Sequence, residues 1–336
     1  MSCRPHGTQP DTHRAMNVFD NPLGPGHLWF DNLVTPAGTA IAYDPQARIF
    51  VTAAAFCANR DRLGCNWAAP EPGALCRSCA MTTLAPDPSM PDAIPHWAEA
   101  ESGKRWVLDN LGRWGWFGPE DTGPSPVFHM LAEGPVPVSM GHAQGVVTIS
   151  VAEADPVLRT SRREALNEPY RTMIGHLRHE IAHVVWWRLS LRADFLDAFR
   201  AMFGDERTDY GEALQRHYGN GPPAGWEQHY LTGYASAHPH EDWAETAAHL
   251  LHLTDIADSF MAAGLGAPDL PATDWDPYAE PDAARLTAAA AAVTLGVNHV
   301  NRAMGLPDLY PFVMSDTARA KLAFVHHWLR RGVREA

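Results

Sequence analysis

The stretch His179-Glu-Ile-Ala-His183 decides how this sequence is interpreted. Side chains four residues apart lie on one face of an α-helix, with Cβ atoms about 6 Å apart, so both imidazoles can reach one ion. Glu180 is rotated by about 100° from His179, so it can approach a metal-bound water without binding the metal. Most of the residues that surround this pattern between Ile174 and Trp187 are apolar, which predicts a buried helix whose polar side chains need partners. A metal is one such partner, and ordinary hydrogen bonding of the two His is the alternative.

A second helix is predicted to begin at Pro239, because proline is favoured at the first helical position. Glu241, Glu245 and His249 follow at intervals of four and share one face of that helix. A hydrolytic zinc ion needs three protein ligands and one open position, and we predict Glu241 as the third ligand. Glu245 is predicted to orient a ligand imidazole through its free N–H. The alternative, two solvated surface acids, is disfavoured by the apolar residues around Trp243.

Three other histidines compete for the place of the third ligand. His176 lies one turn before His179, while His238 and His240 flank the start of the second helix. Any of them would give a three-His site, and otherwise they are supporting or surface residues.

Four of the five cysteines form a separate pattern over residues 57–79: Cys57, Cys65, Cys76 and Cys79. The closing C-x-x-C pair is a tight hook that places two thiolates on one metal, and four thiolates make a closed tetrahedral site. We therefore predict one structural zinc ion here, in addition to one catalytic zinc ion at the histidine site. An iron site with the same ligands and four plain reduced cysteines are the alternatives.

Composition limits the class of protein. The 336 residues, of which 46% are hydrophobic, are enough for a sizeable core. The net charge of −13 comes without any Lys/Arg cluster, which argues against nucleic-acid binding and against anionic membranes. No stretch approaches the roughly 20 apolar residues of a membrane span, and no signal core follows the first residues. The expected location is cytoplasmic.

The order of elements predicts an α+β fold in three parts: an irregular segment at 1–50, a zinc-ribbon-like domain with the four cysteines at 51–90 and a main domain at 91–336. Strands are predicted at 127–131 and 145–151, and the second of these is expected at the edge of its sheet. Helices are predicted at 96–111, 193–203, 223–235, 239–262, 282–304 and 316–331.

Four motifs carry a resemblance to a known family. They are Gly175–His183, Phe203–Tyr210, His238–Thr246 and Leu309–Val313. Together they resemble the bacterial family named putative zinc-binding metallopeptidases, over most of the chain from about residue 50. The resemblance implies a zincin-like, mainly helical metallopeptidase domain with a small sheet, preceded by a zinc ribbon.

The family also implies further cysteine hooks near the N-terminus. The corresponding stretch, residues 28–43, contains no cysteine. Only Cys3 lies upstream, with His6 at C-x-x-H spacing, so the first hook is expected to be absent or degenerate.

A second, local resemblance concerns Glu241-Asp-Trp-Ala-Glu245. It is similar to the Glu-x-x-Ala-Glu element of the anthrax lethal factor catalytic domain and related gluzincins. There the first Glu binds zinc, and a Tyr seven residues earlier assists the transition state. Tyr234 has that spacing here, which suggests an oxyanion donor; a packed core tyrosine is the alternative.

The function predicted from these residues is zinc-dependent cleavage of an amide bond in a peptide or protein. Zinc activates a water, Glu180 accepts its proton, and Tyr234 or a nearby His donates to the oxyanion. One alternative is a non-catalytic scaffold, in which the zinc ribbon docks a partner protein and the second metal is occluded. The other keeps the metal but takes a small amide as substrate.

Overall fold

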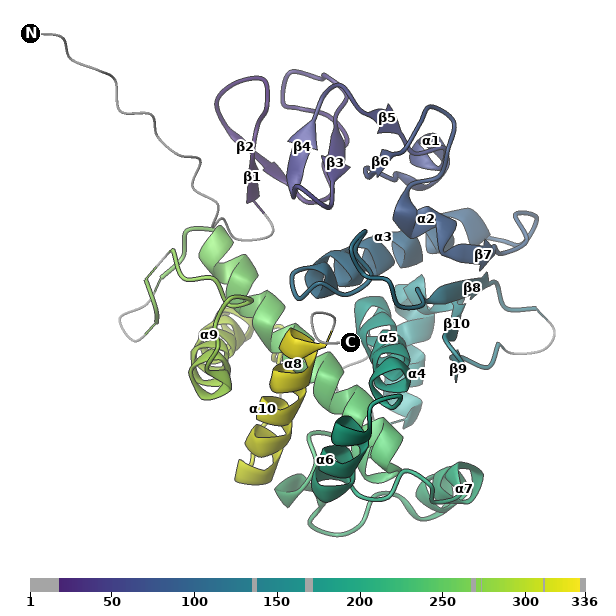
Figure 1. Cartoon of the computed structure of the whole chain (residues 1–336), viewed down its shortest axis with the longest axis vertical. Helices are drawn as coiled ribbons and strands as arrows, with labels where there is room; N and C mark the ends of the chain where they lie inside the picture. Colours follow the sequence, from purple (N-terminus) through teal and green to yellow (C-terminus); the bar gives the residue numbers. More distant parts are fainter. Residues whose placement is uncertain are drawn as a thin grey trace, which may run out of the picture.

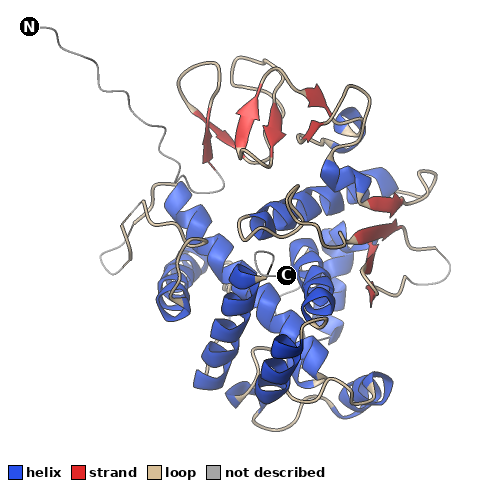
Figure 2. Ribbon diagram, viewed as in Figure 1, coloured by secondary structure: helices blue, strands red, loops and turns tan. Residues whose placement is uncertain are grey.

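The computed structural model describes residues 18–134, 138–166, 172–266, 270–272, 274–310 and 312–332. It is 49% helical and 12% strand, so the expectation of a mainly helical α+β chain with a small sheet is confirmed. The long helix α8 runs through the middle of the helical body, between α5 on one side and α9 and α10 on the other (Figure 1). The short strands β1–β6 gather above α3, at the opposite end from α6 and α7 (Figure 2).

The described helices are α1 (Arg60–Leu63), α2 (Arg77–Ala80), α3 (Ala93–Gly112), α4 (Pro156–Leu166), α5 (Met173–Leu189), α6 (Ala193–Phe203), α7 (Tyr210–Asn220), α8 (Pro239–Ala262), α9 (Ala283–Ala303) and α10 (Asp316–Arg331). Three 3₁₀ turns accompany them: η1 (Val151–Ala154), η2 (Trp226–Gln228) and η3 (Tyr234–Ser236). None of these helices combines the length and the apolarity that crossing a bilayer requires.

The described strands are β1 (Val18–Asp20), β2 (His27–Trp29), β3 (Ala42–Asp44), β4 (Ile49–Val51), β5 (Ala55–Phe56), β6 (Ala68–Ala69), β7 (Thr82–Leu84), β8 (Val127–Leu131), β9 (Gly141–Ala143) and β10 (Val146–Ser150). β1–β2, β3–β4 and β5–β6 form two-stranded sheets, and the larger sheet has the order β7-β8-β10-β9.

The expectation that the strand at 145–151 lies at the sheet edge is wrong. β10 lies between β8, to which it is parallel, and β9, to which it is antiparallel. The reason is a tight hairpin: Gln144 (φ 47°) and Gly145 (φ 86°) both have positive φ, as a two-residue turn of type I′ requires. The hairpin folds β9 back beside β10, so β9 takes the edge position.

The helix predicted at 223–235 is also wrong. Between Gly221 and Gly233 the described chain forms only η2, because Pro222, Pro223 and a left-handed Gly225 (φ 76°) interrupt any helix. The helix forms earlier, as α7, where the side chain of Asp209 caps the N-terminus by accepting from the Glu212 backbone N–H at 2.8 Å.

Contacts at Arg178 fix how α5 is rotated against its neighbours. Its guanidinium forms an ion pair with Asp255 of α8 (Nη2–Oδ2 2.5 Å) and donates to Asn110 of α3 at 3.1 Å. Farther along α5, the Ala182 carbonyl accepts a bond from the buried indole of Trp243 on α8 at 2.9 Å. A buried guanidinium bonded to two other helices has one orientation, and with α5 held in this way His179 and His183 meet the start of α8 at Glu241.

The N-terminal strands belong to the same core as the helices. Buried side chains make continuous contact from Phe19 to Leu329, with the four clustered cysteines among them. The Tyr43 hydroxyl donates to buried Asp109 of α3 at 2.9 Å. Residues 18–51 thus hold β1 to β4 within an otherwise irregular segment, whereas Cys3 and His6 lie outside the described residues.

Candidate functional site

The two histidines of α5 point to a common position. The Thr172 hydroxyl caps the helix by accepting from the Gly175 backbone N–H at 3.0 Å. One turn farther on, His179 and His183 bring their Nε2 atoms within 3.1 Å of one another, with the ring of His183 buried. The helix therefore presents both imidazoles to one ion-sized space, as predicted from their spacing.

The carboxylate of Glu241 reaches the same space from the first turn of α8. Its Oε2 lies 3.0 Å from His179 Nε2, and its Oε1 lies 3.6 Å from His183 Nε2. Ligands about 2.05 Å from a tetrahedral zinc ion are separated by about 3.3 Å. The three side chains therefore match the spacing of a zinc site with one position left for another ligand.

A second carboxylate sets the tautomer of His179. Glu245 Oε1 lies 2.7 Å from His179 Nδ1, and its Oε2 accepts from the Thr232 hydroxyl at 2.7 Å. With one proton on Nδ1, the Nε2 lone pair faces the Glu241 carboxylate, and this contact is repulsive unless a second proton or a metal cation lies between them. Although burial opposes the charged form, hydrogen bonds to Glu241 and Glu245 raise the pKa of His179 well above its ordinary value. The site thus attracts positive charge, and its donors fit zinc.

Glu180 lies beside this group without joining it. Its Oε2 atom is buried and lacks a hydrogen bond among the described residues. Burial raises the pKa of this carboxyl, but the contact with His142 and the nearby imidazoles outweigh burial and lower the pKa below its ordinary value. The carboxylate is therefore ionised at neutral pH and free to accept a proton.

A cavity of about 700 Å³ opens onto these groups. It is lined by β9, β10 and the residues before them, and by Tyr210, Leu214 and Tyr218, which lie at intervals of four on α7. Tyr234 lines the same cavity from η3, with its ring centre 6.0 Å from that of His179. The Tyr210 hydroxyl donates to Glu241 Oε1 at 2.8 Å.

The competing histidines occupy other places. His176 faces η1, with its Nε2 3.3 Å from Glu153. His238 caps α8, accepting from the His240 backbone N–H, and its Nε2 lies 3.1 Å from the Thr208 carbonyl oxygen. His240 lines the cavity, where burial lowers its pKa to about 4. Among the described residues, the groups with metal-binding geometry at the cavity are His179/His183/Glu241 and His142/Glu180/His183.

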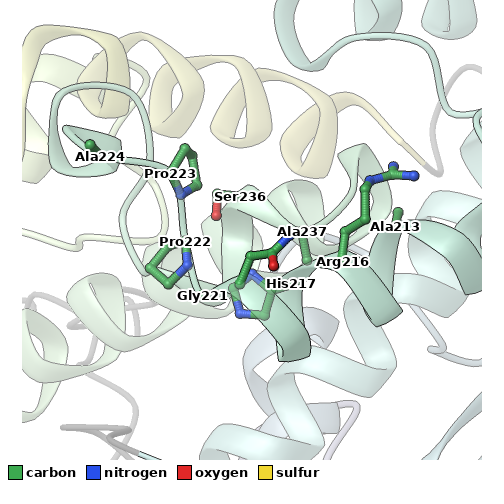
Figure 3. A pocket seen from close by; sticks show the side chains of 10 residues that line it. Ala213, Arg216, His217, Gly221, Pro222, Pro223, Ala224, Ser236 and Ala237 are labelled. Carbon is green, nitrogen blue, oxygen red and sulfur yellow. The ribbon is translucent and has the colours of Figure 1, made fainter.

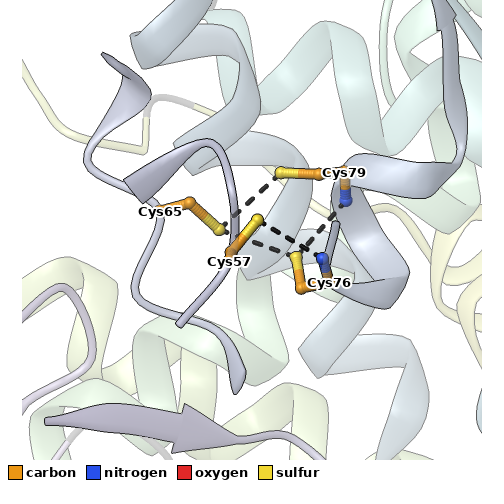
Figure 4. A group of neighbouring side chains, drawn as sticks. All are labelled: Cys57, Cys65, Cys76 and Cys79. Atoms are coloured by element: carbon orange, nitrogen blue, oxygen red, sulfur yellow. Dashed lines mark hydrogen bonds between the residues drawn. The ribbon is translucent and has the colours of Figure 1, made fainter. Parts of the chain in front are cut away.

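The four cysteines meet in a separate cluster, formed by the residues on either side of α1 and by the start of α2 (Figure 4). Cys65 Sγ lies 3.6 Å from Cys76 Sγ and 3.7 Å from Cys79 Sγ. Sulfurs about 2.3 Å from one tetrahedral ion are about 3.8 Å apart, whereas a disulfide needs about 2.05 Å. Backbone N–H groups of Cys76 and Cys79 point to the sulfurs of Cys57 and Cys76 at 3.3 and 3.4 Å. The arrangement fits a closed four-thiolate metal site.

A second pocket, of about 500 Å³, lies against a neighbouring face of α7 (Figure 3). His217 and Arg216 line it from the helix, and Pro222 and Pro223 line it from the following loop. His217 is the one imidazole among its lining residues, and the His/Cys/Asp/Glu clusters of the described chain lie elsewhere. The chemistry is therefore concentrated in the larger cavity.

Comparison with known proteins agrees with this geometry. The family described as "putative zinc-binding metallo-peptidase" matches residues 93–328. The chain belongs to this zinc-binding metallopeptidase family. The resemblance expected from the four motifs is thereby confirmed, and the cysteine cluster precedes the matched region.

Relatives of this chain occur in mycobacteria. Uncharacterised proteins of Mycobacterium bovis and of two strains of Mycobacterium tuberculosis are each 38% identical to it over 282 residues, covering 80% of this chain and 81% of the relative. No solved structure matches the chain.

Two residues at the site were missed from the sequence. Tyr210 ends one of the family motifs, and that position was its only signal. His142 lies in the short strand β9, within a Gly-rich stretch that carries no periodic pattern. Both reach the cavity through the fold, because α7 and the β9–β10 hairpin bring them there.

Glu245→Gln is expected to weaken zinc binding at the histidine site by about 10- to 100-fold, as removal of a carboxylate partner of a ligand imidazole typically does. Competition with a chromogenic chelator measures this affinity. Glu120→Gln is the matched control, because Glu120 is exposed and distant from the cavity lining. Equal zinc affinity in both variants would contradict the orienting role of Glu245.

Proposed function

We propose that this protein is a zinc-dependent peptidase with a gluzincin-type site, in which His179, His183 and Glu241 hold the catalytic zinc. The observation that carries the proposal is the approach of these donors to within 3.0–3.6 Å of one another at the wall of a large cavity. Family membership independently supports peptidase chemistry. The zincin-like fold is part of the same proposal, because the metal helix lies beside a small sheet with its edge strand at the cavity.

Zinc at this site would lower the pKa of a bound water and polarise the scissile carbonyl. Glu180 accepts the proton of the attacking water and delivers it to the leaving amine. Its position supports this role, because it lines the cavity and is ionised at neutral pH.

Tyr234 is proposed as the donor to the developing oxyanion. Its ring lies beside His179 in the cavity wall. Burial and the nearby Glu241 raise the pKa of this phenol, so it remains protonated and able to donate. Tyr210 is less suited, because its hydroxyl already donates to Glu241.

An extended peptide is the proposed substrate, and β9 the proposed place where it binds. β9 lies at the sheet edge and lines the cavity, so its free backbone groups can pair with an added strand. Leu214 and Tyr218 of α7 line the same cavity, where they would contact apolar side chains of the peptide.

The four-cysteine cluster is proposed to hold one structural zinc ion. Its sulfurs are buried, and four thiolates close the coordination sphere, so no substrate can bind there. The ion would connect β6 and α2 to the core that supports α3.

The scaffold alternative requires an occluded metal. His238 is engaged with Thr208 instead of the donor group, and the cavity lies directly beside the donors. Both observations favour an accessible site. A cavity of about 700 Å³ also falls within the range of small-molecule pockets. Cleavage of peptides of different length must therefore be compared with cleavage of a small amide.

The test is metal analysis combined with cleavage of peptides of increasing length. We expect two zinc ions per chain and cleavage that rises with peptide length. 1,10-Phenanthroline should abolish it, and added zinc should restore it. Zinc-loaded protein that cleaves no peptide or small amide would overturn the proposal, and cleavage of small amides alone would favour the amidase.

A further inference from the structure

His142 lies in contact with two of the proposed catalytic residues, His183 and Glu180. It is the central residue of β9, paired in register with Val147 of β10. Its ring stacks on that of His183, with centres 3.8 Å apart and planes at 12°. Its Nδ1 lies 3.7 Å from Glu180 Oε2. One side chain of the edge strand therefore contacts both a proposed zinc ligand and the proposed base.

These contacts are not those of a further metal ligand. Imidazole binds metals through lone pairs in the ring plane, and those of two stacked parallel rings run side by side without meeting. Although His142, Glu180 and His183 place ligand atoms within 4.8 Å of one another, the stacked pair cannot converge on one ion. The contact of His142 with the Glu180 carboxylate is therefore the one that can affect the reaction.

We propose that His142 is a positioning residue, which donates from Nδ1–H to Glu180 Oε2 and so turns the other carboxylate oxygen, Oε1, toward the water that is deprotonated. The proposal rests on the peptidase mechanism above. It assigns a role to Glu180 Oε2, which is buried and has no hydrogen bond among the described residues. At 3.7 Å the contact is longer than a hydrogen bond, and catalytic hydrogen bonds commonly shorten when substrate binds.

The stack on His183 supports the same assignment. It holds the imidazole of His142 flat against a ring that is itself fixed by the metal site. The flanking residues of β9 pair with β10, which limits movement of the backbone. Because the stack and the strand pairing already restrain His142, little conformational entropy is lost when it forms a hydrogen bond to Glu180.

Two substitutions separate the contributions of His142. Asn places an amide N–H close to the position of Nδ1, so His142→Asn keeps the donor and loses the stack. His142→Phe keeps the stack and loses the donor. We expect His142→Phe to lower kcat by about 10- to 100-fold with KM within about twofold, and His142→Asn to recover most of that loss. His27→Asn, at an exposed position of β2, is the matched control.

A readout independent of turnover is the affinity of acetohydroxamic acid for the cobalt-substituted protein, followed by its visible spectrum. A hydroxamate binds the metal and also hydrogen-bonds to the neighbouring carboxylate, so its affinity reports the orientation of Glu180. We expect about tenfold weaker binding to His142→Phe, near-normal binding to His142→Asn, and unchanged metal content in both. Should His142→Phe fail to fold, His142→Gln replaces it, because its longer amide reaches the position of Nε2 instead.

The outcomes are decisive in each direction. Loss of the catalytic zinc in a folded His142→Phe variant would make His142 a ligand and overturn the proposal. Equal kcat and hydroxamate affinity in wild type and His142→Phe would overturn it as well. A wild-type protein that cleaves no peptide refutes the proposed function, while the hydroxamate series still tests how His142 orients Glu180.

Discussion

Glu180→Gln is expected to lower kcat by about 10³-fold while the zinc content and the thermal stability stay at wild-type values. The amide has the size of the carboxylate but cannot accept a proton from water at neutral pH. Because Glu180 stands outside the donor group formed by His179, His183 and Glu241, the metal should remain bound. The measurement is kcat and KM on a peptide that the wild type cleaves, with zinc determined on the same sample.

The matched control is Glu120→Gln, which makes the same chemical change at an exposed position away from the cavity. Wild-type kcat is expected for it. Full activity of Glu180→Gln would remove the base from the mechanism, and loss of zinc from that variant would instead place Glu180 among the ligands. The two results are distinguished by the metal determination alone.

The parts of the site that depend on helix periodicity could be predicted from the sequence. His179 and His183 are one turn apart, and Glu241 and Glu245 are one turn apart, so each pair shares a face whatever the rest of the fold does. The boundaries of α8 were also predicted, because Pro239 marks its first residue and an apolar pattern continues from it. That the two helices meet face to face was suggested only by the need of zinc for a third ligand.

The parts that depend on loops and hairpins could not be predicted. His142 reaches the site because a two-residue turn at Gln144 and Gly145 folds β9 onto β10, and the strand is too short to show alternation. Tyr210 reaches it because α7 forms ahead of the Pro222–Pro223 break. In both cases the deciding information is the path of the chain between elements, which local patterns do not contain.

The cysteine cluster could be predicted from the sequence only in part. The C-x-x-C hook of Cys76 and Cys79 is a local feature that the start of α2 explains. Cys57 and Cys65 are separated from it by longer and less regular spacing. The antiparallel pairing of β5 with β6 brings these two cysteines toward the hook. The ligand chemistry predicts a metal ion, but the path of the chain that brings Cys57 and Cys65 to the hook could not be predicted.

Cys76→Ser is expected to remove the structural zinc and to lower the thermal midpoint by at least about 10 °C. Apparent binding free energies of structural zinc reach about 10–16 kcal/mol, which is comparable with the whole net stability of a domain, about 5–15 kcal/mol. Cys76 is buried, its sulfur lies 3.6 Å from that of Cys65, and it begins the helix that joins the cluster to the core. The measurement is metal content together with a melting curve by circular dichroism.

Cys3→Ser is the matched control, because it makes the same change of sulfur to oxygen at a cysteine that is not part of the four-cysteine cluster. We expect it to keep both zinc ions and the wild-type midpoint. Metal analysis of the wild type also distinguishes zinc from iron, since four thiolates would give an iron site a strong visible colour. A Cys76→Ser protein that lacks the metal but keeps the wild-type thermal midpoint would show that the thiolate site does not stabilise the fold. The buried sulfurs would then pack equally well without an ion.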